Sequence, residues 1–354
     1  MKQPGGQREE EIPWDLVDRC LLPLVFSHAF SVLLSTILGF LGIARLTLVS
    51  VFIPSIALTL ALTLFYHTLK VSCAGKIVVV TGCESRIGYS IAKHLDDLGV
   101  TVLAGFSRNE ESKPKLKEEC SGRLQIFNLD ISSQEHITEA VKLIYQNAPN
   151  GIWAIVNAAS WTAFGEAEWV PMAAFKRMID INLVGTVCFT SALLPLIRKT
   201  KGRIVNLTSI HGRIPTGPRA PLATVTSAIS AFSDALRLSM AKWGVDVVVI
   251  EAGSTTTGAW YDRKDMLDEA RNLWQNLSEE QKASYGENYF ELKISSLREY
   301  QSQQEDLSAL LRSIGDGVTR TFPLPRYTPV TRKEKIQALV AEYLPHSVYN
   351  IIYN

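Results

Sequence analysis

The segment Lys76–Gly88, with the sequence KIVVVTGCESRIG, decides the fold class of this chain. It begins with Ile77–Val80, a run of β-branched residues that is typical of a strand buried on both faces of a parallel sheet. Gly82 and Gly88 follow, and a helical stretch begins between them. A helix N-terminus behind such a turn presents free backbone N–H groups, which favour an anion such as phosphate. The segment therefore predicts the first strand and helix of an α/β domain, with a phosphate site at the turn.

Short apolar runs alternate with helical stretches over the rest of the chain. This alternation predicts a doubly wound parallel sheet with helices on both faces, the α/β class. We expect strands over Lys76–Thr81, Val100–Gly105, Leu124–Phe127, Trp153–Asn157, Arg203–Leu207, Asp246–Glu251 and Arg326–Pro329. We expect helices over Ser133–Gln146, Met172–Lys199, Leu222–Trp243, Asp262–Leu277, Glu279–Gln304 and Lys333–Tyr343. Ser278 and Gln281 predict a capping box for the helix that begins at Glu279.

Charge and cysteine content exclude several classes of protein. Lysine and arginine number 36 and aspartate and glutamate 35, so the net charge is +1. This balance gives no basic surface for a polyanion, and we expect no nucleic-acid partner. The five cysteines show no CxxC and no metal-ligand spacing, which indicates scattered reduced or buried thiols and no metal site. They are Cys20, Cys73, Cys83, Cys120 and Cys188.

Two long apolar runs precede the α/β segment. Leu21–Ile43 and Leu46–Tyr66 carry no formal charge, and about twenty apolar residues suffice to cross a bilayer as a helix. A cleaved signal peptide fits poorly, because acidic Glu9–Glu11 precedes the runs in place of a basic cluster. The runs predict a membrane anchor, either two spans joined at Ala44–Arg45 or one span with a re-entrant or interfacial piece.

These features divide the chain into three parts. We expect an N-terminal tail over residues 1–20 and a membrane anchor over residues 21–67, with apolar spans at 21–43 and 46–66. The α/β domain is expected over residues 75–354. Within it, the pattern changes to charged helices beyond Gly258.

Four further features follow the glycine turn along the chain. Asp130 ends the third expected strand, and the turn NAAS, Asn157–Ser160, follows the fourth. Asn182 lies in INLVG, and Ser209 closes the strand that begins at Arg203. Together with TGCESRIG, this order resembles the short-chain dehydrogenase/reductase family over residues 75 to about 260. The resemblance implies a Rossmann-like fold, an NAD(P) cofactor, oxidoreductase chemistry on CH–OH groups, and a substrate lid over residues 259–325.

The resemblance assigns the phosphates of the cofactor to the glycine turn. Gly82 and Gly88 keep two of the three glycines of the family motif TGxxxGxG, Arg86 replaces the middle one, and Ile87 follows it. A cation in the first helical turn opposes the helix dipole, and its bulk falls where the pyrophosphate should pack. Alternatively, Arg86 folds outward and pairs with a phosphate. Both alternatives stay open.

Two residues bear on the adenosine half of the cofactor. Asp130 matches the family aspartate that contacts the adenine amine, or it caps the helix that follows. The end of the second expected strand has no acid for the ribose 2′-hydroxyl, whereas Arg108 could accept a 2′-phosphate. NADP is therefore favoured over NAD.

The nicotinamide half of the expected site departs further from the family. Asn157 keeps the first asparagine of the family turn, but Ser160 replaces its glycine. After the sixth expected strand, Glu251–Gly253 replaces a Pro-Gly turn, and Thr257 keeps a hydroxyl that usually contacts the cofactor. Gly253 and Thr257 are therefore expected cofactor contacts, with an altered backbone beside them.

The reacting centre lacks its usual proton donor. In the family, the catalytic serine is followed thirteen residues later by Tyr-x-x-x-Lys; counted from Ser209, those positions hold Leu222 and Thr226. Leucine cannot exchange a proton, and loss of a general acid–base group costs about 10²–10⁴-fold in rate. Asn182 and Ser209 keep the family's other catalytic positions. His211 could serve as a substitute acid or base, or it could be structural.

Within the family, the chain is similar to the membrane-anchored group of 17β-hydroxysteroid dehydrogenase type 2, with retinol and β-hydroxybutyrate dehydrogenases, and to insect Shroud-type proteins. Among the matching stretches are Leu193–Lys199, Gly151–Ala154, Ala241–Gly244 and Tyr285–Tyr289. The resemblance implies a steroid, sterol or retinoid ligand and a membrane location, in the endoplasmic reticulum. The resemblance is also compatible with a homodimer.

Two functional hypotheses remain open. In one, the protein acts in steroid or related lipid metabolism by a route that does not use a Tyr–Lys pair. In the other, it is a non-catalytic pseudoenzyme that binds a sterol or scaffolds a membrane complex. The departures at Arg86, Ser160, Leu222 and Thr226 favour the second, whereas the retained Asn182 favours the first.

Overall fold

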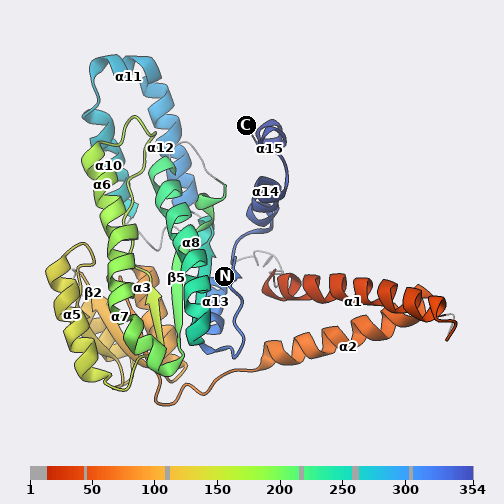
Figure 1. The fold of residues 1–354 in the computed structure, drawn as a ribbon. Coiled ribbons are helices and arrows are strands. Elements are labelled where there is room, and N and C mark those ends of the chain that lie inside the picture. Colours follow the sequence, from red (N-terminus) through yellow and green to blue (C-terminus); the bar gives the residue numbers. More distant parts are fainter. Residues whose placement is uncertain are drawn as a thin grey trace, which may run out of the picture. The chain divides into compact units, whose positions relative to one another are not determined.

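The computed structural model describes residues 14–43, 46–107, 112–214, 219–256, 263–302 and 306–353 (Figure 1). The chain divides into two compact units. One contains Met1–Ser72 and Thr319–Leu324, and the other contains Cys73–Val318 and Pro325–Asn354. The apolar helices lie in the first unit and the sheet in the second.

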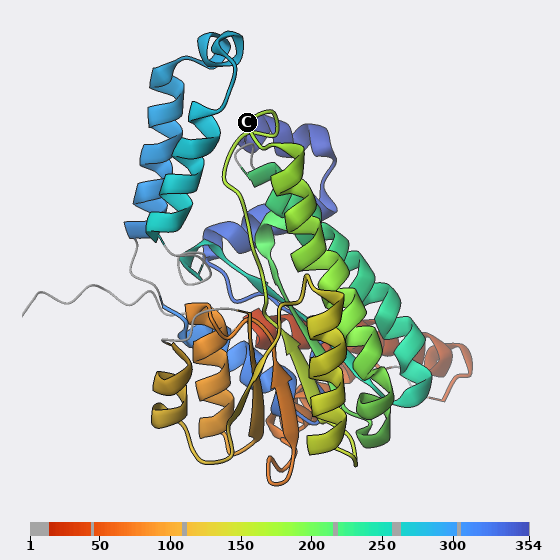
Figure 2. The ribbon, with the colours of Figure 1, turned by 90° about the vertical axis from the view of Figure 1, so that its left-hand side faces the viewer.

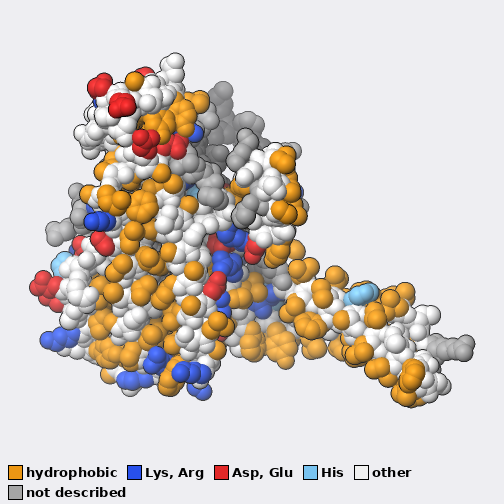
Figure 3. Space-filling model, turned by 45° about the horizontal axis from the view of Figure 1, so that its top comes forward, with side chains coloured by type: hydrophobic (Ala, Val, Ile, Leu, Met, Phe, Trp, Pro, Cys, Tyr) orange, Lys and Arg blue, Asp and Glu red, His pale blue; other side chains and the backbone are white. Residues whose placement is uncertain are grey.

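The first unit is built on two antiparallel apolar helices, α1 (Trp14–Phe40) and α2 (Leu48–Thr68) (Figure 1). The hydroxyls of Ser27 and Thr59 share a hydrogen bond of 2.8 Å between the helices. Hydrophobic side chains cover the outside of the pair (Figure 3). By length and composition, both helices could cross a membrane. Positions 44 and 45, where the connecting turn was expected, lie outside the described residues.

The second unit is built on a seven-stranded parallel sheet with the order β3-β2-β1-β4-β5-β6-β7. The strands are β1 (Ile77–Val80), β2 (Thr101–Phe106), β3 (Gln125–Asn128), β4 (Ala154–Asn157), β5 (Arg203–Ser209), β6 (Asp246–Ala252) and β7 (Arg326–Tyr327). Every expected strand is present, and the doubly wound α/β class is confirmed. The strand order reverses between β1 and β4, which is where sheets of this class open a crevice for ligands.

Helices cover both faces of the sheet (Figure 2). On one face, α5 (Gln134–Asn147) and α7 (Thr186–Thr200) pack on a core that includes Val79, Phe127, Ile155 and Ile204. On the other face, α13 (Ser308–Thr319) packs on β5 and β6 and lies against α3 (Arg86–Asp97). The remaining α-helices are α4 (Ser112–Glu119), α6 (Met172–Ile179), α8 (Ala220–Met240), α10 (Arg263–Gln275), α11 (Glu279–Tyr285), α12 (Glu287–Ser302), α14 (Arg332–Tyr343) and α15 (His346–Tyr353).

The helix expected over Met172–Lys199 is continuous, but its pitch changes in the middle. Between α6 and α7 lies a π-helical segment, η1 (Asp180–Gly185), and such segments are frequent at functional sites. By length and composition, this stretch could also span a membrane. Its apolar character has another explanation, because Phe189 and Leu193 are fully buried in the core on the sheet.

The single helix expected over Glu279–Gln304 is wrong. Gly286, with φ +82°, ends α11, and α12 begins at the next residue. The conformation of Gly286 is one that side chains rarely adopt, and it turns the chain between the two helices. The capping box of Ser278 and Gln281 at the start of α11 is confirmed.

Candidate functional site

The glycine turn after β1 is closely packed. Gly82 has φ +74°, and a Cβ there would lie 2.5 Å from the Cα of Ala159 in the turn after β4. A Cβ on Gly88 would lie 2.1 Å from the carbonyl oxygen of Gly82. Both positions therefore require glycine, because backbone meets backbone there. Ser85 caps α3 and accepts a hydrogen bond of 3.0 Å from the Gly88 N–H.

The first two residues of α3 differ in exposure. Arg86 is the first helical residue and its side chain is exposed, whereas Ile87 is fully buried against the sheet. The first N–H groups of a helix have no partner within it and favour negative charge. The turn and the helix start thus fit the pyrophosphate of a dinucleotide.

Glu84 was not expected at the site, but its carboxylate lies at the end of β2. Its carboxylate accepts two hydrogen bonds from Ser107, of 2.8 Å from the hydroxyl and 3.2 Å from the backbone N–H. An acid therefore does occupy this strand end, supplied by the glycine turn of the neighbouring strand. A carboxylate repels a 2′-phosphate, which weighs against NADP. Arg108, the expected phosphate partner, lies outside the described residues.

Asp130 lies in the turn after β3 and organises that turn. Its carboxylate accepts hydrogen bonds from the N–H and the hydroxyl of Ser132, at 3.0 and 2.6 Å. The N-cap of α5 is Ser133, whose hydroxyl accepts from the His136 N–H. The alternative that Asp130 caps this helix is therefore wrong, and its contact with adenine stays a prediction.

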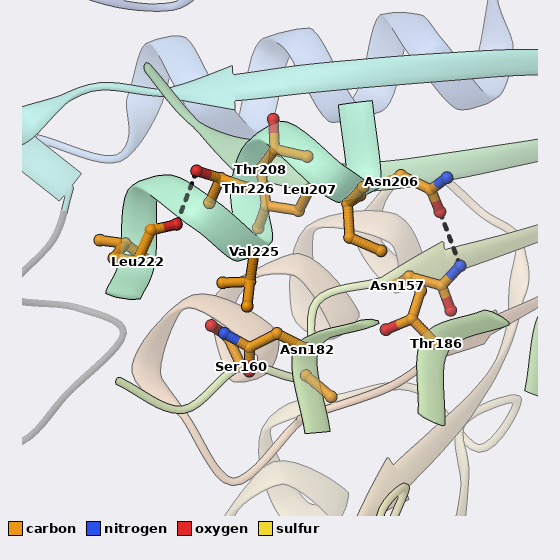
Figure 4. A pocket seen from close by; sticks show the side chains of 12 residues that line it. Asn157, Ser160, Asn182, Thr186, Asn206, Leu207, Thr208, Leu222, Val225 and Thr226 are labelled. Carbon is orange, nitrogen blue, oxygen red and sulfur yellow. Dashed lines mark hydrogen bonds between the residues drawn. The ribbon is translucent and has the colours of Figure 1, made fainter. Parts of the chain in front are cut away.

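A cavity opens where β4, β5, η1 and α8 meet (Figure 4). Its empty volume is about 410 Å³, including the open mouth. It is lined by Asn157, Ala159, Ser160, Asn182, Thr186, Asn206, Leu207, Thr208, Leu222, Val225, Thr226 and Ile229. This lining contains hydroxyls, amides and apolar groups, but none of its side chains titrates near neutral pH. Among the described residues, no group of three or more His, Cys, Asp or Glu could hold a metal ion.

Leu222 and Thr226 form one wall of this cavity, one helical turn apart on α8 (Figure 4). Both are buried. The Thr226 hydroxyl lies 2.8 Å from the carbonyl oxygen of Leu222 and 3.2 Å from that of Ala223, and its proton is donated within the helix. Leu222 and Thr226, the two residues expected at the reacting centre, thus line the same cavity. Neither side chain offers the cavity a group that titrates near neutral pH.

Asn182 lies in the π-helical segment and lines the same cavity. Its amide clamps the backbone of Trp161, donating to the carbonyl and accepting from the N–H, both at 2.8 Å. The amide is therefore committed to holding the segment after β4. The guanidinium of Arg177 lies 4.4 Å from the centre of the Trp161 ring and adds to this contact.

Ser209 is the last residue of β5, and His211 follows in the short helix η2 (Ile210–Gly212). The Ser209 hydroxyl accepts a 3.3 Å hydrogen bond from the His211 N–H. Burial and the charge of the contacting Arg219 guanidinium lower the pKa of His211 to about 3. The imidazole is neutral near pH 7 and is not among the residues that line the cavity. These features weigh against His211 as a substitute acid.

A chain of buried polar groups supports the floor of the cavity. Asn157 donates from its amide nitrogen to Asn206 Oδ1 at 2.7 Å and to the Thr190 hydroxyl at 2.9 Å. Asn206 in turn donates to the Ser233 hydroxyl at 2.8 Å. Asn157 therefore ties β4 to β5 and α7, a role that the sequence did not indicate.

Gly253, after β6, is buried, and a Cβ there would lie 2.9 Å from the carboxylate of Glu334 on α14. The backbone N–H of Ser254 donates to the same carboxylate at 2.8 Å. The turn after β6 is thus held by the C-terminal helix α14. Thr257, the expected cofactor contact, lies outside the described residues.

The protein-family model for short chain dehydrogenase matches residues 76–268 of this chain. The mitochondrial D-beta-hydroxybutyrate dehydrogenase of Mus musculus is 32% identical over 290 residues, which cover 80% of this chain and 84% of that relative. The 17-beta-hydroxysteroid dehydrogenase type 2 of Homo sapiens is 32% identical over 286 residues, or 78% of this chain and 72% of that relative.

A solved structure of a short-chain dehydrogenase from Streptomyces avermitilis aligns with a TM-score of 0.63 at 20% identity. The alignment covers 80% of this chain and 96% of that chain, and it shows a common fold. The matching sequence model covers more than half of the chain, and the relatives are similar over most of their length. This protein is therefore a member of the short-chain dehydrogenase/reductase family.

Proposed function

We propose that this protein is a membrane-anchored member of its family that binds a steroid, sterol or related lipophilic alcohol or ketone and acts in lipid metabolism without Tyr–Lys proton transfer. One observation carries the proposal. The cavity beside Asn182 has Leu222 and Thr226 in its wall and no titratable side chain in its lining. Such a cavity can bind a hydroxyl or a carbonyl, but it cannot protonate or deprotonate one efficiently.

The class of ligand follows from the relatives. Two of them are named for hydroxysteroid and hydroxybutyrate oxidation, so a small alcohol or ketone is the common feature of their ligands. The apolar helices α1 and α2 support an anchor in a membrane, where a steroid-like ligand partitions. We place that membrane in the endoplasmic reticulum, with a homodimer as a compatible assembly.

A nicotinamide nucleotide is the proposed cofactor, and when bound it supplies hydride transfer. The glycine turn from Gly82 to Gly88 would hold its pyrophosphate, with Arg86 and Ile87 at the helix start. Asp130 would contact the adenine, and Gly253 and Thr257 would lie at the nicotinamide end. The Glu84 carboxylate at the end of β2 favours NAD over NADP, contrary to the preference expected from Arg108 alone.

The family members' chemistry needs a proton moved at the substrate oxygen as the hydride moves at carbon. In the family's arrangement Ser209 would polarise that oxygen, but here it is buried and is not among the residues that line the cavity. Nothing in the lining of the cavity can then take or give the proton, since Leu222 is apolar and the Thr226 hydroxyl donates to its own helix. Turnover by this route is expected to be slower by about 10²–10⁴-fold than with a general acid.

A non-catalytic, sterol-binding role is the second candidate, and one observation favours it. The departures from the family at Ser160, Leu222 and Thr226 meet at one cavity, while the sheet is intact. Departures that gather at the reacting centre, with a further one at Arg86 in the glycine turn, are what selection for binding without turnover would leave behind. Ser209 and Asn182 argue for the first candidate, because both family positions are retained.

The test is binding of NADH and NADPH to the full-length protein in detergent micelles, measured by calorimetry. Micromolar binding of either nucleotide supports the oxidoreductase role and justifies a search for turnover with steroid alcohols. No binding at millimolar nucleotide rules out hydride transfer and leaves the sterol-binding role.

A further inference from the structure

The strands of the sheet begin at one edge, and cations gather along it. Because the strands are parallel, the loops that lead into β1, β4, β5 and β6 all lie at this edge. Lysine and arginine side chains line the lower margin of the sheet unit in Figure 3. The cavity is lined by residues at the other ends of β4 and β5, so the edge where the strands begin has no part in it.

Four cations at this edge surround one tryptophan and form a basic patch. The patch comes from the end of α7 and from the short helix η4 (Ala241–Trp243), which precede the neighbouring strands β5 and β6. The ring centre of Trp243 lies 4.8 Å from the guanidinium carbon of Arg198 and 5.7 Å from Nζ of Lys242. A Cβ on Gly244 would lie 3.6 Å from Cδ of Lys201, so that side chain packs on the same turn. The basic patch is Arg198, Lys199, Lys201, Lys242 and Trp243.

The patch is exposed, and ion pairs do not neutralise it. Lys199, Lys201 and Lys242 are exposed, and within the part of the chain that the structure describes none of them has a carboxylate partner. The acid at the start of β6, Asp246, lies 3.6 Å from the buried guanidinium of Arg203. The patch is therefore positively charged, which the net charge of +1 for the whole chain did not predict.

Exposed apolar side chains accompany the cations. Leu238, one turn before Lys242, is 82% exposed, and Trp243 is 44% exposed. The helix dipole favours cations at the end of α7, which accounts for Arg198 and Lys199 but not for the leucine and the tryptophan. Tryptophan and leucine beside lysines are typical of a protein surface that lies against lipid headgroups.

The chain reaches this edge directly from the apolar helices. Helix α2 ends at Thr68 and β1 begins at Ile77, so residues 69–76 are the whole link. Eight residues span at most about 28 Å. Strand β6 is three strand spacings from β1 in the sheet, or about 14 Å. A membrane that holds α1 and α2 is thus tethered close to the patch, and a tethered partner needs only weak attraction to be bound.

We propose that the basic patch binds the anionic headgroups of the membrane in which α1 and α2 are anchored, with Trp243 and Leu238 at the lipid surface. The proposal rests on the membrane anchor of the proposed function. Charge selects the partner, because each lysine or arginine close to an anionic lipid surface strengthens the contact about fivefold. The contact holds the sheet in one orientation, with the edge where its strands begin toward the bilayer.

The experiment compares the reactivity of lysines in two lipids. The full-length protein is placed in nanodiscs of phosphatidylcholine, alone or mixed with phosphatidylserine, and the rate of lysine acetylation is measured by mass spectrometry. We expect the rates at Lys201 and Lys242 to be about fivefold lower with phosphatidylserine, and 1 M salt to remove the difference. Lys176 is the internal control. It is exposed on the same helical stretch, 23 residues before Lys199 and so about 35 Å away, and should react equally in both lipids.

A pair of double variants locates the effect. Lys201→Glu with Lys242→Glu should abolish the protection of Lys199 by phosphatidylserine, because the reversed charges repel the headgroups. Lys176→Glu with Lys333→Glu makes the same change at exposed positions of α6 and α14 and should leave Lys201 and Lys242 protected. The comparison of lipids in the unaltered chain needs no variant, so it decides the question even if a variant does not fold.

Equal acetylation of Lys201 and Lys242 in the two lipids would overturn the proposal. So would protection that is the same with and without phosphatidylserine, which would indicate a second copy of the chain on the patch. Failure of the anchor has a separate readout, since alkaline carbonate would then release the protein from vesicles, and the proposal would fail with its tether. Nucleotide and steroid binding in detergent test the rest of the proposed function without any lipid charge.

Discussion

The hydroxyl of Thr226 lies 2.8 Å from the carbonyl oxygen of Leu222, one turn earlier on α8, and donates to it. This hydrogen bond stays inside the helix, so the wall of the cavity presents a methyl group and a leucine side chain. A family member that moves protons needs a titratable group at this wall. The bond between these two residues keeps the Thr226 proton inside α8, so neither residue offers the cavity a titratable group.

Restoring the proton donor should restore turnover if the scaffold is intact. We expect the double variant Leu222→Tyr with Thr226→Lys to gain oxidation of a steroid alcohol by about 10²-fold or more over the unaltered chain, because a positioned general acid contributes at least that much. The single variants should gain little, since the tyrosine pKa needs the lysine charge beside it. NADH fluorescence with 5α-androstan-17β-ol measures the gain.

A matched control tests whether a gain in turnover comes from the restored pair or only from an added positive charge on α8. Thr224→Lys, combined with Leu222→Tyr, adds the same cation at an exposed position of α8. This control should remain inactive. If the restored pair binds nucleotide yet gives no turnover, the loss extends beyond these two positions, and Ser160 becomes the next candidate.

Glu84 should set the choice of nucleotide. Its carboxylate is held at the end of β2 by two hydrogen bonds from Ser107, where it repels a 2′-phosphate. We expect the unaltered chain to bind NADH at least about tenfold more tightly than NADPH, and Glu84→Gln to lose most of that preference. Calorimetry with both nucleotides measures it, with Glu118→Gln, an exposed change on α4, as the control. A preference for NADPH in the unaltered chain would contradict this role.

The sequence predicted the sheet better than the site. Strands such as Ile77–Val80 are apolar throughout, so their burial on both faces can be read from composition. Gly286 shows the limit for helices. A single glycine can be tolerated inside a helix, and only the structure shows that this one takes a positive φ and ends α11.

The site depends on contacts between residues that are far apart in sequence. Glu84 reaches Ser107, 23 positions later, only because β1 and β2 are neighbours in the sheet. The signal that could have found it was an acid in a turn that faces the end of the adjacent strand. The amide chain from Asn157 through Asn206 to Ser233 joins three elements of the fold, β4, β5 and α8, and no local pattern marks it.

His211 should make the folded protein less stable in acid. Burial and the Arg219 charge lower its pKa from 6.5 to about 3, so the folded state resists a proton that the unfolded chain accepts. The contribution of His211 to the free energy of unfolding is complete above the pKa of the unfolded chain, 6.5, and is lost as pH falls toward 3. Between pH 7.5 and 5.0 this amounts to about 2 kcal/mol. Unfolding by chaotrope at the two pH values measures it.

The variant His211→Gln should reduce that acid sensitivity by the same amount, because glutamine does not titrate and can still accept from Arg219. His136→Gln, an exposed change on α5, should leave it unaltered. If both variants lose stability in acid as the unaltered chain does, the imidazole is not held neutral, and a role for His211 in proton transfer returns.

Glu251 should be the most costly single carboxylate to remove. It is 1% exposed at the end of β6, with Oε2 3.1 Å from Nη1 of Arg213 and Oε1 in contact with Arg326. Removing the charge takes the buried carboxylate from two partly buried guanidiniums, which keep only the more exposed carboxylates of Glu342 and Asp234. We expect Glu251→Gln to lower the free energy of unfolding by about 3 kcal/mol, the lower end for a broken buried pair because both arginines keep some exposure.

The matched control uses a partner on the surface. Asp234 also pairs with Arg326, at 3.1 Å, but it is half exposed, so Asp234→Asn should cost under about 1 kcal/mol. Salt distinguishes the two further, since 1 M salt screens the exposed pair and leaves the buried one nearly unchanged. A loss in Glu251→Gln that added salt abolished would mean that this carboxylate is reached by solvent, and that β6 is not fixed to Arg213 and Arg326 through it.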